Sequence, residues 1–221
     1  MLTVKSFTFS PLTENTFVLF NEENNCCIID PGCYYSNERK ELQEFIGDLK
    51  LTPKYLLNTH CHLDHVFGNR FVFDNYGTVL HLHQKEMPLL EYAPSFGINW
   101  GLPFDNYDKE VIFLKEGDSI RLDNDELRVL FTPGHSPGHI CFYCESQHFI
   151  ISGDVLFKLS IGRTDLPAGD HATLISSIRE KLMVLPDDVV VYPGHGEATT
   201  IGFEKLHNPF LANTTEFNLQ S

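Results

Sequence analysis

The sequence predicts an α/β (α+β) protein in which two β-sheets pack face to face and helices cover their outer sides. Apolar runs of strand length are followed by a helical pattern in the first half of the chain, and the same succession returns in the second half. No stretch rich in Gly, Ser and Pro separates the halves, so we expect one domain over residues 1–221.

The first half begins as a β-meander, because short apolar or alternating runs are separated by turn-forming residues. Strands are expected over residues 2–8, 16–20, 26–30, 54–57 and 78–82. Helices are expected from Ser36, over residues 65–73 and over residues 84–92. The first of these helices has Ser36 as its N-cap and an apolar stripe formed by Leu42, Phe45, Ile46 and Leu49.

The second half contains further strands and one long helix. Strands are expected over residues 111–114, 119–122, 127–131, 140–144, 149–152 and 189–192. A helix is expected over residues 170–183, where Leu174, Ile175, Ile178 and Leu182 share one face. Residues 92–107 contain Pro, Gly and aromatic side chains in no periodic order, so we expect an irregular segment there, either a substrate wall or an outer layer on the core.

The composition excludes several classes of partner. The formal net charge is −14 and the chain has no basic run, which argues against binding to nucleic acid or to an anionic membrane. No signal peptide and no apolar run of membrane-spanning length is present, so we expect a cytoplasmic protein whose six cysteines are reduced thiols. Cys141 and Cys144 fall on opposite faces of one predicted strand, which argues against a shared metal.

A cluster of metal-binding side chains follows the predicted strand at residues 54–57. His60, His62, Asp64 and His65 lie within six residues, and imidazole and carboxylate together suit zinc and its first-row neighbours. His60 and His62 can project from the same side of an extended loop, whereas Asp64 and His65 fall where the chain turns into a helix. The spacing therefore predicts two adjacent metal sites.

Three later turns each offer one more ligand at the end of an apolar strand. They carry His135, Asp154 and His195, and glycine precedes the ligand in all three. Glycine permits a tight turn and a close approach of the backbone to its neighbours. Ligands gathered beyond strand ends are common in layered α/β proteins, so we expect these side chains to join the first cluster.

The order of the motifs resembles the metallo-β-lactamase superfamily. T-H-x-H-x-D-H at residues 59–65 is followed by P-G-H, G-D and P-G-H-G, and the resemblance extends from the turn at Asp30 to Pro209. Residues 162–165 (G-R-T-D) and 199–202 (T-T-I-G) are similar to segments of the small, single-domain glyoxalase-II-like hydrolases. The resemblance implies a four-layer αββα sandwich with a dinuclear metal site at one edge.

The resemblance also implies a role for each ligand. The first metal would be held by His60, His62 and His135, the second by Asp64, His65 and His195, and Asp154 would bridge the two. Zinc is the first choice for both divalent ions, with iron or manganese as alternatives. His139 is expected to form hydrogen bonds behind the ligands and not to ligate a metal itself.

The implied chemistry is hydrolysis. Two divalent cations lower the pKa of a shared water from about 15.7 towards about 7, and the resulting bridging hydroxide is the expected nucleophile. Asp64, His65 and Asp154 form the catalytic group in this interpretation, and Asp64 also orients the water. Arg163 and Lys158 follow the Asp154 turn and are candidates for binding a substrate carboxylate, although Arg163 could instead pair with Asp165.

Two enzymatic functions follow from the resemblance. The first is hydrolysis of a thioester such as S-lactoylglutathione, as in glyoxalase II. The larger enzymes of that type have a C-terminal helical domain, whereas only residues 196–221 follow His195, so a smaller thioester, another thiol carrier or a lactone remain alternatives. The second is a persulfide dioxygenase with one iron held by His60, His135 and Asp154. A non-enzymatic metal-binding module is the third alternative, and a monomer and a homodimer are both open.

Overall fold

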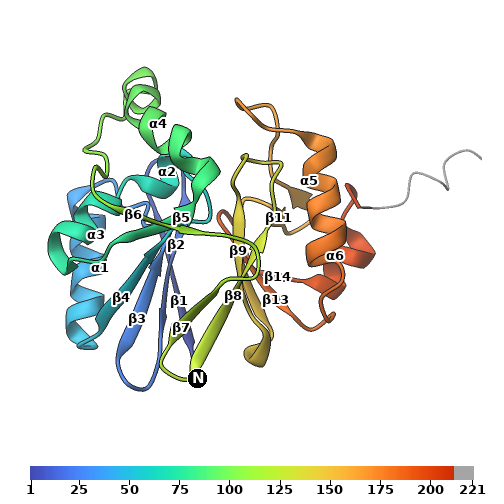
Figure 1. The fold of residues 1–221 in the computed structure, drawn as a ribbon, viewed down its shortest axis with the longest axis horizontal. Coiled ribbons are helices and arrows are strands. Elements are labelled where there is room, and N and C mark those ends of the chain that lie inside the picture. The colour runs from blue at the N-terminus through green and yellow to red at the C-terminus, as the bar shows by residue number, and fades with distance from the viewer. Residues whose placement is uncertain (212–221) are drawn as a thin grey trace, which may run out of the picture.

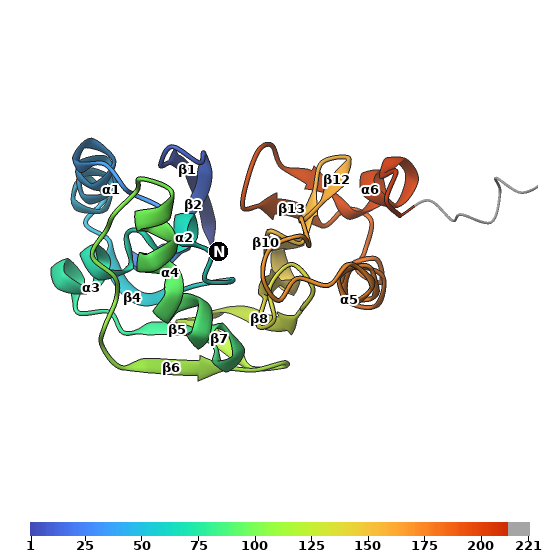
Figure 2. The same cartoon turned by 90° about the horizontal axis from the view of Figure 1, so that it is seen from above.

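The computed structural model, which describes residues 1–211, contains two six-stranded sheets packed between two layers of helices (Figure 1). Helices α1, α3 and α4 lie on the side of the first sheet, and α5 and α6 lie on the side of the second (Figure 2). This arrangement confirms the predicted four-layer αββα architecture.

The first sheet has the strand order β1-β2-β3-β4-β5-β6. Its strands are β1 (Thr3–Phe9), β2 (Glu14–Phe20), β3 (Asn25–Ile29), β4 (Thr52–Leu57), β5 (Leu80–His83) and β6 (Val111–Leu114). β1, β2 and β3 pair antiparallel as a meander, and the pairs from β3 to β6 are parallel. The parallel strands β3, β4 and β5 therefore end at the same edge of the sheet, where the loops that follow them meet.

The second sheet has the order β14-β13-β10-β9-β8-β7. Its strands are β7 (Ser119–Leu122), β8 (Asp125–Phe131), β9 (Ile140–Cys144), β10 (Phe149–Gly153), β13 (Val190–Pro193) and β14 (Thr199–Thr200). β10 and β13 are parallel, so the turns after them reach the same edge. A separate hairpin, β11 (Leu156–Phe157) and β12 (Ser160–Ile161), follows β10.

Helices cover the outer face of each sheet. On the first sheet they are α1 (Ser36–Asp48), α2 (Leu63–Val66), α3 (Asn69–Tyr76) and α4 (Met87–Asn99). On the second sheet they are α5 (His171–Ser177), which continues as a π-helical turn over Ile178–Leu182, and α6 (Ile201–His207). None of the helices within residues 1–211 is long and apolar enough to cross a bilayer.

The core lies in three layers, because alternate residues of each strand point to opposite faces. Phe17 and Phe142 pack between the sheets, whereas Val18 packs towards α1 and Ile150 packs towards α5. Cys141 and Cys144 belong to different layers, as the sequence predicts. All six cysteines are buried and free.

The prediction of an irregular segment over residues 92–107 is wrong for the first part of that segment. Helix α4 continues through Pro94 to Asn99, where an early end was expected at Tyr92. Leu90, Ala93 and Gly97 are buried at helical spacing, so packing outweighs the helix-breaking tendency of proline. Residues 102–107 are irregular, as expected.

The predicted helix over residues 65–73 is divided into α2 and α3 at Gly68. The Gly68 amide donates to the carbonyl of Pro31 at 2.7 Å, and a β-carbon at this position would collide with Cys33 Sγ and the Pro31 carbonyl. The helix break thus brings the chain close to the turn after β3. As a result α2 is a single short turn placed directly beyond the end of β4.

Candidate metal centre

The seven predicted metal ligands come together at one edge of the sandwich. His60 and His62 lie in the loop after β4, and Asp64 and His65 lie on α2. The other three come from turns of the second sheet: His135 between β8 and β9, Asp154 after β10 and His195 after β13. Both sheets contribute, so packing of the two halves forms the centre.

The first group consists of His60, His62 and His135. Nε2 of His135 lies 2.8 Å from Nδ1 of His62 and 3.2 Å from Nε2 of His60. Burial lowers the pKa of all three imidazoles, to about 4 for His62 and His135. Neutral imidazole is the form that binds metals, and all three are neutral at pH 7.

The second group consists of Asp64, His65 and His195. Oδ2 of Asp64 lies 3.2 Å from Nε2 of His195 and 3.8 Å from Nε2 of His65. Burial disfavours protonation of His65 and His195, but the carboxylates of Asp64 and Asp154 outweigh it and raise the pKa of both imidazoles. The negative potential that raises these pKa values also favours a divalent cation at the same position.

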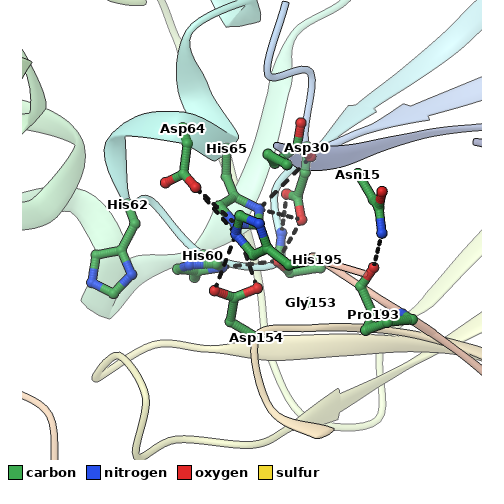
Figure 3. Close-up of polar contacts among 12 residues, drawn as sticks. Asn15, Asp30, His60, His62, Asp64, His65, Gly153, Asp154, Pro193 and His195 are labelled. Carbon is green, nitrogen blue, oxygen red and sulfur yellow. Dashed lines mark hydrogen bonds and ion pairs between the residues drawn. The ribbon is translucent and has the colours of Figure 1, made fainter. Parts of the chain in front are cut away.

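Asp154 lies between the two groups. Its Oδ2 is 3.5 Å from Nε2 of His135 and 3.6 Å from Nε2 of His195, and its Oδ1 is 3.6 Å from Nε2 of His65. Figure 3 shows His60, His65 and His195 gathered around this carboxylate. The approach depends on Gly194, where a β-carbon would collide with Oδ1 of Asp154 and with the ring of His65.

In four histidines, the hydrogen bond of Nδ1 fixes the ring so that Nε2 faces the centre. Nδ1 of His65 faces Asp30 Oδ2, Nδ1 of His135 faces the Arg163 carbonyl and Nδ1 of His195 faces the Thr13 carbonyl, at 2.7–3.2 Å. Nδ1 of His60 faces Thr59 Oγ1, which itself donates to Asp30. Each Nδ1 must therefore donate, which directs each Nε2 inward, where a metal ion would take the place of its proton.

These inward-facing nitrogens make the site fit a metal. Lone pairs of His60 and His135 face each other, and Nε2 of His65 and Oδ1 of Asp154 are buried with no hydrogen-bond partner. Such an arrangement is costly unless a cation occupies the space between the atoms. Nitrogen and carboxylate oxygen are donors for zinc, iron and manganese. Asp30, His60 and His65 also lie close enough to hold an ion.

Asp30 is nevertheless better described as a residue that orients the ligands. Besides His65 it accepts from the Thr59 amide at 2.7 Å and from Asn58 Nδ2 at 3.1 Å. Asp64 and Asp30 lie on opposite sides of His65 (Figure 3). From the sequence alone, Asp30 is only the last residue of the strand expected over residues 26–30. A carboxylate at the buried end of an apolar strand was the signal that could have identified it.

His139 lies behind Asp154. Its Nε2 accepts from the Asp154 amide at 3.1 Å, and its Nδ1 lies 3.1 Å from Thr132 Oγ1. The side chain is fully buried. The structure therefore places His139 within hydrogen-bonding distance of the Asp154 backbone.

Glu86 is a second residue that no motif in the sequence identifies. This buried carboxylate accepts from the Cys61 amide at 2.8 Å, from Ser136 Oγ at 2.8 Å and from the Gly138 amide at 2.6 Å. Burial raises its pKa, which these hydrogen bonds partly oppose. Glu86 therefore joins the loop of His60 and His62 to the loop of His135.

A cavity of about 470 Å³ opens in front of the centre, with His62, Asp64, His135, Asp154 and His195 on its inner wall. Arg163 also lines the cavity, but its guanidinium forms two hydrogen bonds with Asp165, both at 2.7 Å. Lys158 is not part of the cavity wall and pairs with Glu197 at 2.7 Å. Of the two basic residues considered for substrate binding, only Arg163 borders the cavity.

Comparisons with known proteins found similarity along most of the chain. A family model described as metallo-beta-lactamase superfamily matches residues 10–195. A protein from Haemophilus influenzae named hydroxyacylglutathione hydrolase GloC is 42% identical over 200 residues, which cover 90% of this chain and 92% of that protein.

Two similar crystal structures share the fold over nearly their whole length. One, titled BLEG-1 B3 metallo-beta-lactamase, has a TM-score of 0.87 at 37% identity and covers 95% of this chain and 100% of its own. The other, titled TTHA1623 in a di-iron-bound form, has a TM-score of 0.84 at 37% identity and covers 94% and 100%. The chain belongs to the metallo-β-lactamase superfamily.

Proposed function

We propose that this protein is a metal-dependent hydrolase that cleaves thioesters. The observation that carries the proposal is the pair of ligand groups, His60, His62, His135 and Asp64, His65, His195, which share the carboxylate of Asp154 at the inner end of a cavity. Similarity to a protein named hydroxyacylglutathione hydrolase supports a thioester such as S-lactoylglutathione as the class of substrate.

Two divalent cations, if bound by these residues, would supply Lewis acidity and lower the pKa of water towards about 7. The carboxylates of Asp64 and Asp154 border the cavity and orient the water that attacks the carbonyl carbon. Asp30 and His139 keep His65 and Asp154 in place through their hydrogen bonds. Water adds to the carbonyl carbon, the carbon–sulfur bond breaks, and the products are a carboxylate and a thiol.

We infer that zinc is the native metal, because its preferred ligands are the nitrogen and oxygen donors present here. Iron is the alternative, since one similar structure is described as di-iron-bound. We also infer that the chain functions as one domain, because each ligand group takes side chains from both halves of the sequence.

The test is thiol release from a panel of acyl thioesters by metal-loaded protein, with a chromogenic β-lactam included because one similar structure carries the β-lactamase name. We expect thioester turnover that is lost after chelation and in Asp64→Ala. Absence of thioester turnover, unchanged turnover in Asp64→Ala, or faster cleavage of the β-lactam would overturn the proposal.

A persulfide dioxygenase with one iron is the second candidate. His135 Nε2 lies 3.2 Å from His60 Nε2 and 3.5 Å from Asp154 Oδ2, so these three side chains are close enough to share one ion. The G-R-T-D sequence at residues 162–165 is a second support for this candidate. Metal analysis and oxygen consumption with glutathione persulfide discriminate. One iron per chain with oxygen uptake favours the dioxygenase, and two metals with no uptake favour the hydrolase.

A further inference from the structure

We propose that the substrate carries an apolar, uncharged substituent that occupies the cavity against helix α4. This inference rests on the proposed thioester hydrolysis and specifies which thioesters the site selects.

One wall of the cavity is an apolar stripe on α4. Leu89, Ala93, Phe96 and Trp100 all line the cavity, and their spacing of four, three and four residues puts them on one face of the helix. Trp100 is 54% exposed, so a large apolar surface remains available to a ligand. Covering such a surface is favourable because it removes apolar area from water.

The facing wall has the same character. Leu12 precedes β2, Phe157 and Ile161 belong to the β11–β12 hairpin, and Leu166 follows it. Two segments that are far apart in the sequence thus add apolar side chains to the cavity that the α4 stripe lines. The cavity volume of about 470 Å³ is within the range of sites that enclose small organic ligands.

Charge is almost absent from these walls. Among the described residues that line the cavity, Arg163 is the one charged side chain apart from the candidate metal ligands. Both Nε and Nη2 of Arg163 are engaged by Asp165, each at 2.7 Å. Asp165 therefore neutralises much of the Arg163 charge, and a substrate carboxylate would compete with Asp165 for the guanidinium.

Glutathione carries two carboxylates and an ammonium group, whereas Arg163, the cation on the described cavity wall, is already paired with Asp165. An aromatic or branched apolar group instead matches both walls without breaking the Arg163–Asp165 pair. The geometry does not require the apolar group to be on the acyl side or on the thiol side, and the experiment separates the two.

The experiment measures kcat/KM of the metal-loaded protein for four thioesters, which combine an acetyl or phenylacetyl group with glutathione or benzyl mercaptan. Each value is divided by the rate of uncatalysed alkaline hydrolysis of the same ester. We expect at least one phenyl-bearing ester to exceed acetylglutathione by about ten-fold, the factor expected when an apolar ring leaves water. Equal efficiency for all four esters would overturn this inference alone, whereas no thiol release from any of them would overturn the proposed function.

Variants of α4 identify the surface responsible. Phe96→Ala and Trp100→Ala should remove most of the ten-fold preference for the phenyl-bearing esters over acetylglutathione. Ile98→Ala is the matched control, because Ile98 is on the same helix, 68% exposed and not part of the cavity wall. Persistence of the preference in both aromatic variants would contradict a role for α4.

A third variant tests the charge argument. Asp165→Asn frees Arg163 and should raise kcat/KM for acetylglutathione by about three-fold, the modest change expected for an exposed ion pair. The esters of benzyl mercaptan, which have no carboxylate, should not respond. Unchanged turnover of acetylglutathione in Asp165→Asn would show that the ion pair does not disfavour charged substrates.

Discussion

Oε1 of Glu86 lies 2.6 Å from the amide nitrogen of Gly138, and this contact connects the start of α4 to the loop that carries His135. The other oxygen of Glu86 accepts from the Cys61 amide, between His60 and His62. One buried carboxylate therefore holds the cavity wall and both loops of the first ligand group in a fixed relation.

Replacing Glu86 should weaken metal binding and stability together. Glu86→Ala leaves buried amide donors of Cys61 and Gly138 without partners, which we expect to lower the free energy of unfolding by about 2–4 kcal/mol. Glu86→Gln keeps one oxygen that can accept a hydrogen bond, so it should lower the free energy of unfolding by a smaller amount. Urea unfolding of the metal-free protein measures the stability, and competition with a chromogenic chelator measures the metal affinity.

The control for Glu86 is Glu91→Ala, which removes an exposed carboxylate from the same helix. We expect Glu91→Ala to change neither the free energy of unfolding nor the metal affinity appreciably. If Glu86→Ala and Glu91→Ala behave alike in both assays, Glu86 does not organise the centre.

Single ligand variants should distinguish the two metal positions. His135→Ala and His195→Ala each remove a ligand from one group, so we expect each to reduce the metal content from about two ions per chain to about one. Asp154→Ala removes a carboxylate near both groups and should reduce the content further. Atomic emission on dialysed protein measures the stoichiometry.

His171→Ala, at an exposed histidine at the start of α5, is the control for these variants and should retain the wild-type metal content. Equal and complete loss of metal in His135→Ala and His195→Ala would show that the two groups do not bind independently. Wild-type content in both would show that these residues are not ligands.

The candidate ligands could be predicted from the sequence because each one follows the end of an apolar strand. At these places a metal-binding residue type occurs where an α/β fold commonly gathers its ligands. His60 to His65 are local in the sequence, and the turns at His135, Asp154 and His195 repeat the same glycine signal. The parallel pairing of β3 with β4 and of β10 with β13 then brings these strand ends to one edge.

Glu86 could not be found in this way, because its partners lie 25, 50 and 52 residues away in the sequence. At the start of a helix it has the pattern of an exposed carboxylate. The extension of α4 past Pro94 depends on tertiary burial, which outweighs local propensity. The strands β11, β12 and β14 have two residues each, too few to produce a periodic pattern.

The cysteine thiols should be unreactive in the folded protein. All six are buried, and burial raises the pKa of Cys26, Cys33 and Cys141 to about 12, so the reactive thiolate is scarce at pH 8. We expect iodoacetamide to leave native protein unmodified over an hour and to label all six cysteines in denaturant, as measured by intact mass. Rapid labelling of the native protein would contradict the burial of these side chains.

The Glu116–Lys181 pair should contribute a pH-dependent increment of stability far from the metal centre. Glu116 accepts from Lys181 Nζ at 2.7 Å and from the Phe131 amide at 2.5 Å, joining the start of the second sheet to the turn after α5. Burial raises the pKa of this carboxyl, but the two hydrogen bonds and the Lys181 charge outweigh it and lower the pKa below its ordinary value of 4.5.

Because the pKa of Glu116 is lower in the folded state than in the unfolded state, its contribution is complete above about pH 4.5 and is lost as the pH falls through the lower folded value. Both side chains are more than one-third exposed, so we expect Glu116→Gln to cost only about 0.5–1 kcal/mol at pH 7. Urea unfolding of wild type and Glu116→Gln at pH 7 and pH 3 measures the difference, and Glu22→Gln on the exposed turn after β2 is the control. A cost in Glu116→Gln that is equally large at both pH values would refute an origin in the carboxylate charge, because that contribution must diminish in acid.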